Sequence, residues 1–256
     1  MELSYLDLIP SELIELLVYP LNKEDLFNFI QLVSIKNIVW SRVLEYHFGY
    51  PKKVTIDDYI RYLDVERFKN KLEDINKIKN LSIDESIKLQ ELNLYNNKIR
   101  EIPKEIENLI NLQELNLSDT KTKEIPKEIG NLTNLQILYL RHNQIQNVPV
   151  EIGNLTNLQL LYLNNNQIRE IPKEIGNLIN LKELSFGNNQ INDVPVEIGN
   201  LKNLKILYLH NNQITSIPKQ LGNLINLKTL YLDHNHICDI PKEIKDIPGI
   251  YIMNKN

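Results

Sequence analysis

The chain has 256 residues, of which 42% are hydrophobic, and its 29 basic and 33 acidic side chains give a formal net charge of −4. This near-balance argues against a broadly basic nucleic-acid binder, and no apolar run is long enough to cross a bilayer. The N-terminus does not read as a secretory signal, and the single cysteine cannot form an internal disulfide. We therefore expect a cytoplasmic protein that binds neither nucleic acid nor membrane.

Residues 1–50 are predicted to form a small all-α domain. Three helices are predicted, at 10–17, 23–33 and 39–48, because apolar residues recur on one helical face. Pro10 suits the first turn of the first helix, and Gly49 ends the third. Residues 51–88 are predicted to form a helical linker that ends in a short, degenerate entry repeat.

Part of this N-terminal segment carries a degenerate motif. The motif reads Ile9-Pro10-x-Glu12-Leu13, Leu16-Leu17, Leu21, Asp25-Leu26, Val33-Ser34 and then Val39-Trp40-x-x-Val43-Leu44-x-x-x-Phe48-Gly49. It resembles an F-box, a helical module that docks onto the Skp-type adaptor of a cullin–RING ubiquitin ligase. The resemblance implies that four residues contact this adaptor, namely Pro10, Leu13, Leu16 and Leu17. The alternative is that these helices only cap the domain that follows.

A 23-residue period occupies residues 89–249. Leucines at 89, 112, 135, 158, 181, 204 and 227 begin seven equal units, and residues 250–256 form a truncated C-terminal cap. Each unit reads L-x-x-L-x-L-x-x-N-x-I-x-x-I-P-x-E-I-G-N-L-x-N, with some substitutions. This is the leucine-rich repeat pattern, and it predicts an α/β solenoid whose strands stack into a curved parallel sheet.

The columns of the repeat have separate structural roles. Leucines at positions 4 and 6 alternate with polar residues, as in a strand with one buried face. Asparagine at position 9 is expected to bond backbone groups of adjacent turns, and proline at position 15 to stiffen the convex side. The segment after the proline is expected to be a short helix or 3₁₀ turn with Gly at its end. Repeat 2 has Thr120 and Thr122 where Asn and Ile are expected, so its turn should be the loosest.

The strand positions that face outward are predicted to bind a partner on the concave side of the sheet. These are positions 3, 5, 7 and 8, and we call the surface that they form the sheet face. Its predicted contact residues are Ile137, Tyr139, Arg141, Leu160, Tyr162, Ile206, Tyr208, His210, Tyr231 and Asp233. Exposed aromatic and aliphatic clusters suit protein contacts, and Glu183, Ser185 and Gly187 are expected to leave a gap between two such clusters. The alternative is a tyrosine ladder that only stabilises the sheet.

No catalytic, cofactor or metal motif is expected in this chain. The segment Asp233-His234-Asn235-His236-Ile237-Cys238-Asp239 holds several metal-ligating side chains, but its ladder asparagine makes the neighbouring residues diverge around a turn. The P-loop, the dinucleotide glycine fingerprint and the G-x-S-x-G motif do not occur in the sequence.

The domain order indicates a function in protein recognition. An F-box followed by leucine-rich repeats is typical of substrate receptors of SCF-type ubiquitin ligases, which are not themselves enzymes. The repeats are also similar to Ras-group intracellular leucine-rich repeat proteins, which implies the alternative of a stand-alone scaffold for a signalling protein. In either case we expect a monomer that binds a protein target.

Overall fold

The computed structural model of the chain describes residue 86 and residues 88–254. The predicted N-terminal helices, the F-box-like segment and nearly all of the entry repeat lie outside these residues. Within the part that is described, no helix is long and apolar enough to span a membrane.

Eight short parallel strands form one sheet in sequence order, each strand bonded to the next. The strands are β1 (Glu91–Asn93), β2 (Glu114–Asn116), β3 (Ile137–Tyr139), β4 (Leu160–Tyr162), β5 (Glu183–Ser185), β6 (Ile206–Tyr208), β7 (Thr229–Tyr231) and β8 (Tyr251–Met253). Up to β7 the register is one repeat, so equivalent positions of neighbouring units lie side by side. The predicted parallel-sheet solenoid is thus confirmed for residues 89–254.

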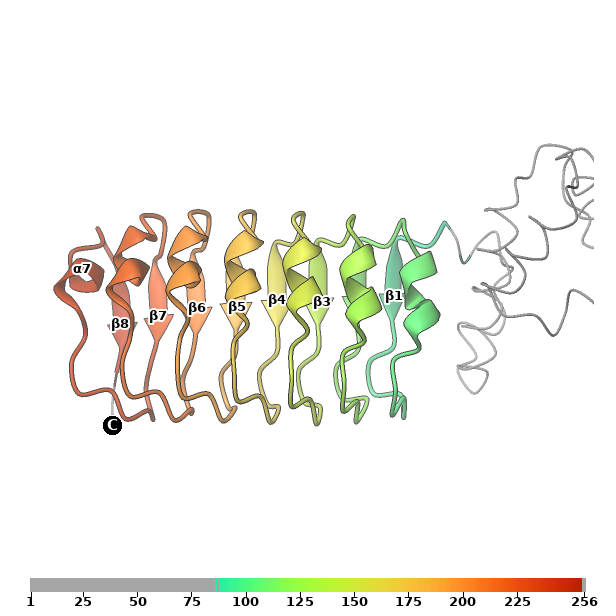
Figure 1. Cartoon of the computed structure of the whole chain (residues 1–256), viewed down its shortest axis with the longest axis horizontal. Helices are drawn as coiled ribbons and strands as arrows, with labels where there is room; N and C mark the ends of the chain where they lie inside the picture. Colours follow the sequence, from blue (N-terminus) through green and yellow to red (C-terminus); the bar gives the residue numbers. More distant parts are fainter. Residues whose placement is uncertain (1–85, 87, 255–256) are drawn as a thin grey trace, which may run out of the picture. The chain divides into compact units, whose positions relative to one another are not determined.

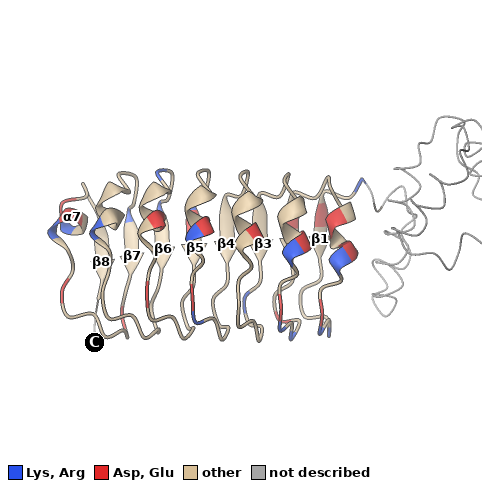
Figure 2. Cartoon of the chain, in the orientation of Figure 1, with Lys and Arg blue, Asp and Glu red and all other residues tan. Residues whose placement is uncertain are grey.

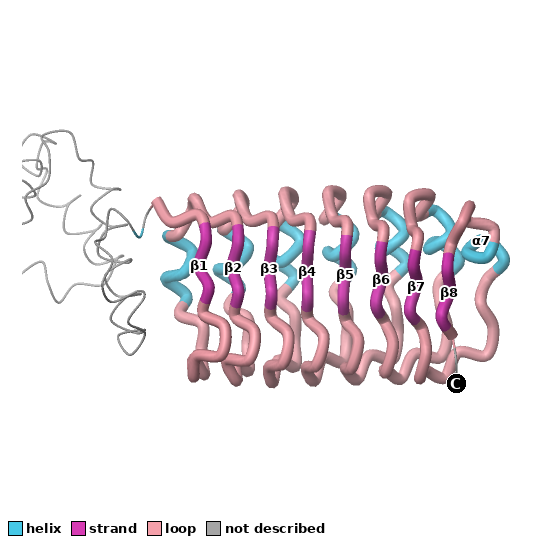
Figure 3. The backbone as a smooth tube through the Cα atoms, turned by 180° about the vertical axis from the view of Figure 1, so that it is seen from behind, coloured by secondary structure: helices cyan, strands magenta, loops and turns pink. Residues whose placement is uncertain are grey.

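A row of short helices covers the other side of each turn (Figures 1 and 3). Six are 3₁₀ helices and the last is a single α-helical turn: η1 (Lys104–Asn108), η2 (Lys127–Asn131), η3 (Val150–Asn154), η4 (Lys173–Asn177), η5 (Val196–Asn200), η6 (Lys219–Asn223) and α7 (Lys242–Lys245). Most begin with a Lys-Glu or Val-Glu pair, so charged residues gather at their first turns, on the side away from the strands (Figure 2).

The core lies between the strands and the helices. Leucines at positions 4 and 6 are fully buried in the middle repeats, as are the Ile or Leu of each 3₁₀ helix and the leucine that follows it. In repeat 5, Phe186 replaces the leucine of position 6 and is the largest fully buried side chain among the described residues. Because each unit buries its apolar side only against its neighbours, the stability of any one repeat depends on the repeats beside it.

Proline at position 15 starts each 3₁₀ helix rather than only stiffening the loop before it. Pro172, for example, has φ −65° and ψ 140° at the N-cap of η4, and its carbonyl accepts a hydrogen bond from the Ile175 amide at 3.1 Å. Proline is well suited to this place, because a residue that precedes the first helical turn needs no amide donor of its own.

The expected role of the glycine in these helices is wrong. Gly176 lies inside η4, which ends at Asn177 and has Leu178 as its C-cap. Among the described glycines only Gly249 has a positive φ, of 68°. Gly176 is needed for a close approach instead, because a Cβ atom there would lie 2.6 Å from the Glu197 carbonyl oxygen of the next helix.

Asparagine at position 9 forms the predicted ladder between turns. The Asn166 amide nitrogen donates to the carbonyls of Leu140 and Leu163, at 2.9 and 3.0 Å, and its amide oxygen accepts from the Ile145 amide at 3.0 Å. The same set of bonds recurs at Asn189, Asn212 and Asn235. One side chain therefore fixes the loop of its own repeat to the loop of the preceding repeat.

Repeat 2 closes its turn with two hydroxyls. Thr120 and Thr122 are fully buried and lie 2.7 Å apart between their Oγ1 atoms. Thr120 donates to the Leu117 carbonyl at 2.9 Å and Thr122 to the Ile99 carbonyl at 3.0 Å. The two threonines thus satisfy two carbonyls, although the side-chain bond to the Ile99 amide that an asparagine would make is missing here. The lower stability of this turn stays a prediction.

Position 8 has the same unusual backbone in all seven repeats. Its residues have φ between 54° and 59°, the left-handed region, and they are only Asn, Asp or His: Asn96, Asp119, His142, Asn165, Asn188, Asn211 and His234. Of the residues with a side chain, these types tolerate this conformation best. The chain therefore turns away from the sheet at this position.

Candidate functional site

Within the sheet face, the predicted contact residues are the outward side chains of positions 3, 5 and 7, at the sides of the buried leucines. The structure brings the predicted contact residues together on this one surface, at equivalent places on β3, β4, β6 and β7 and, for Arg141, His210 and Asp233, two residues after the strand ends. Except for the more exposed Arg141, they are all half-buried. The surface is therefore partly apolar and open to solvent.

Four tyrosines of position 5 form two stacked pairs. The rings of Tyr139 and Tyr162 have centroids 5.4 Å apart and an interplanar angle of 29°. Tyr208 and Tyr231 are 4.8 Å apart and almost parallel, at 6°. The guanidinium of Arg141 lies over the Tyr139 ring, 5.8 Å from its centroid. Both pairs are thus held in place by ring contacts and present a preformed aromatic surface.

The expected gap between the two pairs is filled. Ser185 is only 4% exposed, and the His210 ring covers Gly187 so closely that a Cβ atom there would lie 2.4 Å from the ring. On the neighbouring strand, the Tyr162 hydroxyl donates a hydrogen bond to the Glu183 carboxylate. Larger side chains of the adjacent strands therefore occupy the space that the small residues leave.

Glu183 influences tyrosines on both of its sides. Burial, then the hydrogen bond to Glu183 and the charge of that carboxylate, raise the pKa of the Tyr162 hydroxyl well above its ordinary value of 10.0. Burial and then the same carboxylate raise the pKa of Tyr208. The pKa of Tyr139 is also raised, mainly by burial and by the charge of Glu114 and to a smaller extent by Glu183. A negative charge raises a phenol's pKa because it opposes formation of the phenolate.

His210 and Asp233 lie at the C-terminal side of the sheet face. The His210 ring meets the rings of Tyr208 and Tyr231 edge-on, at 6.2 and 6.3 Å between centroids. Its Nδ1 atom and the Asp233 Oδ1 atom are buried without a hydrogen-bond partner. An unpaired buried polar atom costs free energy of folding, so these two atoms lower the stability of this part of the face and are not accessible contacts for a partner.

The residues after Asp233 do not converge. The His234 side chain is 64% exposed and lies 4.0 Å from Asp233, whereas the Cys238 thiol lies 3.9 Å from the His236 carbonyl. Across residues 86 and 88–254, no group of three or more His, Cys, Asp and Glu side chains could hold a metal ion.

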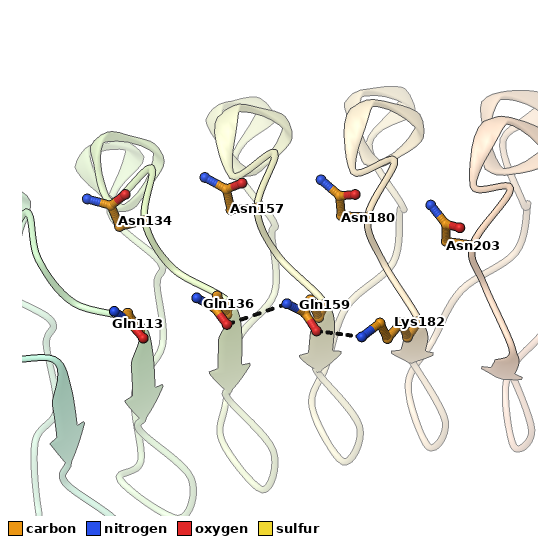
Figure 4. Close-up of a pocket in the computed structure, with 8 residues that line it drawn as sticks. All are labelled: Gln113, Asn134, Gln136, Asn157, Gln159, Asn180, Lys182 and Asn203. Carbon is orange, nitrogen blue, oxygen red and sulfur yellow. Dashed lines mark hydrogen bonds between the residues drawn. The ribbon is translucent and has the colours of Figure 1, made fainter.

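The sequence did not lead us to a second surface, a polar groove of about 540 Å³ along the edge where the strands begin. It lies between two rows of side chains, one from position 2 and one from position 23: Gln113, Gln136, Gln159 and Lys182, and Asn134, Asn157, Asn180 and Asn203 (Figure 4). Lys182 donates to Gln159 at 2.8 Å. Each asparagine donates to a carbonyl of the preceding repeat, as Asn157 does to Thr133 at 2.9 Å. The N-L-x-N spacing was the signal for this second ladder.

The four predicted adaptor-contact residues, Pro10, Leu13, Leu16 and Leu17, lie outside the described residues. Their role stays a prediction from the sequence.

Comparisons with solved structures give the same fold. A leucine-rich repeat protein of Leptospira interrogans is 42% identical, with a TM-score of 0.53 over 64% of this chain and 48% of that chain. The leucine-rich repeat ectodomain of the Arabidopsis thaliana membrane receptor kinase GASSHO1/SCHENGEN3, in complex with CASPARIAN STRIP INTEGRITY FACTOR 2, is 31% identical, with a TM-score of 0.61 over 66% and 22% of the two chains. The plant peptide hormone receptor RGFR1, in complex with RGF2, is 30% identical, with a TM-score of 0.57 over 66% and 32%.

This chain thus spans less than half the length of each of these three proteins. No curated protein matches it in sequence. A family model described as a leucine-rich repeat region matches residues 57–143, 127–184 and 172–249, which together cover most of the chain. The chain therefore belongs to the leucine-rich repeat family.

Proposed function

We propose that this protein is a non-enzymatic substrate receptor of an SCF-type ubiquitin ligase, which holds its target on the sheet face. The observation that carries the recognition part is the two stacked tyrosine pairs, with Leu160 on the same strand as Tyr162 and Ile206 on the same strand as Tyr208. Fixed aromatic side chains next to aliphatic ones suit protein contacts, because little side-chain entropy is lost when a partner binds.

The ligase part rests on the F-box-like segment before the repeats. A receptor of this kind acts by proximity, because it raises the local concentration of target lysines near a recruited conjugating enzyme. That action needs two separate surfaces, one for the adaptor and one for the target.

A binding measurement with a purified Skp-type adaptor tests the ligase part. We expect the full chain to bind the adaptor, and a variant with Leu13→Glu and Leu16→Glu to lose binding while its repeats unfold at the same temperature as before. Binding that survives both changes, or no binding by the parent chain, would refute the receptor role.

A second experiment tests the sheet face. Leu160→Ala with Tyr162→Ala should reduce recovery of proteins that crosslink to the parent chain in cells. The matched control is Lys173→Ala with Glu174→Ala on the helix side of the same repeat, which should leave recovery unchanged. Equal recovery by both variants would show that the target binds elsewhere.

A stand-alone binding module is the second candidate, and the similarity of the I-P-x-E-I-G-N-L units to Ras-group proteins favours it. Solved neighbours of this chain include a membrane receptor kinase ectodomain in complex with CASPARIAN STRIP INTEGRITY FACTOR 2 and a plant peptide hormone receptor in complex with RGF2. This candidate predicts the same loss in the sheet-face variant but no affinity for the adaptor.

A further inference from the structure

Glu183 lies at the centre of the sheet face, surrounded by apolar and aromatic side chains. At its own level of the sheet its neighbours are Leu160 on β4 and Ile206 on β6. Two residues further along the three strands, Tyr162 and Tyr208 lie on either side of the buried Ser185. The carboxylate therefore has four apolar or aromatic side chains around it, which we call the apolar collar: Leu160, Tyr162, Ile206 and Tyr208.

No positive group of the described chain neutralises this carboxylate. Among the residues that the structure describes, only the neutral Tyr162 hydroxyl donates a hydrogen bond to the Glu183 side chain, and no lysine or arginine forms an ion pair with it. The adjacent Lys182 donates to Gln159 instead. A half-buried carboxylate with one neutral donor keeps lone pairs for a further, charged donor.

The charge of the whole face agrees with this. Residues 89–256 contain 17 basic and 18 acidic side chains. Positions 3, 5 and 7 of the seven repeats contribute one of the basic groups, Arg141, and four of the acidic groups: Glu91, Glu114, Glu183 and Asp233. The rest of the repeat region thus has 16 basic and 14 acidic groups. The excess of negative charge is concentrated on the sheet face, which favours a basic partner.

From this arrangement we infer that Glu183 anchors an arginine side chain of the protein partner, an inference that rests on the proposed binding at the sheet face. The guanidinium would form a charge-assisted hydrogen bond with the carboxylate, and its alkyl stem would pack on Leu160 and Ile206. Arginine suits this place better than lysine, because its planar guanidinium also stacks on tyrosine rings. The apolar collar excludes water from the ion pair, as around other binding hot spots.

A selection of random peptides displayed on phage, with the full chain as bait, tests this anchor. We expect the selected peptides to share a basic residue, predominantly arginine. Changing that arginine to Gln in a resynthesised peptide should weaken binding about tenfold to a hundredfold, the range for a hydrogen bond between charged groups.

The variant Glu183→Gln removes the charge and retains an oxygen that accepts the Tyr162 hydrogen bond. It should weaken binding by the same factor, and combining it with the arginine change in the peptide should cause little further loss. Glu114→Gln is the matched control, because Glu114 has the same position in repeat 2 but Glu91 on one side in place of an apolar neighbour. We expect at most about a threefold loss for this control, because Glu114 lies outside the group of side chains proposed to hold the arginine.

The outcomes separate this inference from the proposed function. The arginine anchor is refuted if no peptide is selected or if the selected peptides lack a basic residue. It is also refuted if Glu114→Gln and Glu183→Gln weaken binding equally, or if the effects of Glu183→Gln and of the arginine change in the peptide add up independently. If peptides are selected and their binding still disappears with Tyr208→Ala, the sheet face remains the binding surface. If it survives that change as well, the proposed function is also refuted.

Discussion

The asparagine ladder gives a prediction whose size follows from its bonds. Replacing Asn166 by Ala removes its bonds to the Leu140 carbonyl and the Ile145 amide of repeat 3 and to the Leu163 carbonyl of its own repeat 4. Each of the two carbonyls that lose a donor keeps another, because Asn143 also reaches Leu140, at 3.1 Å, and Asn189 reaches Leu163, at 3.0 Å. The amide of Ile145 keeps no partner, since its only hydrogen bond was to Asn166.

The cost can be worked out from these losses. An orphaned backbone amide costs about 1–3 kcal/mol, and each of the two lost carbonyl bonds about 0.5–1.5 kcal/mol. We therefore expect the free energy of unfolding of Asn166→Ala to fall by about 2–6 kcal/mol. The matched control is Asn157→Ala in the second ladder. The exposed Asn157 side chain makes one bond, to the Thr133 carbonyl at 2.9 Å. That change should cost about 1 kcal/mol or less.

Urea unfolding followed by circular dichroism measures the difference between the two variants. Hydrogen exchange locates it, because the Ile145 amide should exchange much faster in Asn166→Ala and at the parent rate in Asn157→Ala. Similar losses of stability in both variants, or unchanged protection of Ile145, would show that the ladder does not connect the repeats in the way described.

Three further predictions concern other parts of the array. Gly176→Ala should lower the free energy of unfolding by more than about 1 kcal/mol in urea titrations, because its Cβ would meet a backbone carbonyl of the next helix that cannot easily move; an unaffected midpoint would disprove the close contact. The absorbance of phenolate should show that Tyr162 ionises only above its ordinary pKa of 10.0. Since the folded state holds the hydroxyl proton more tightly than the unfolded state, the stability that this proton contributes is complete below pH 10 and is lost as the pH rises through the pKa of the folded state. Changing Thr120 to Asn together with Thr122 to Ile should raise stability by about 1 kcal/mol, and slower exchange of the Ile99 amide would support a looser natural turn; exchange at the parent rate would contradict it.

Features that repeat every 23 residues could be predicted from the sequence. The ladder of Asn166 and the buried strand leucines follow from the spacing alone, because each column must solve the same packing and hydrogen-bond problem in every turn. The proline column was placed correctly for the same reason. The second ladder at Asn157 is harder to predict, because its N-L-x-N spacing lies among exposed loop residues, where a recurring asparagine does not have to make a bond.

Features of single repeats were harder to predict. The gap expected at Ser185 is closed, because Tyr162 and His210 extend across strand boundaries toward neighbouring repeats. The direction of a long side chain depends on its own rotamer and on adjacent turns, and the column pattern does not contain that information. The role of Gly176 was misjudged similarly, since the space above its Cα is set by the next helix and not by its own turn.

The left-handed backbone at position 8 limits how such a surface can diversify. Two of the five histidines in the chain, His142 and His234, occur there among asparagines and an aspartate, so backbone conformation is a sufficient reason for their presence. A β-branched or bulky residue at this place would strain every turn that contained it. Differences between related sheet faces of this kind are therefore expected mainly at positions 3, 5 and 7 of each repeat, while position 8 stays restricted to Asn, Asp and His.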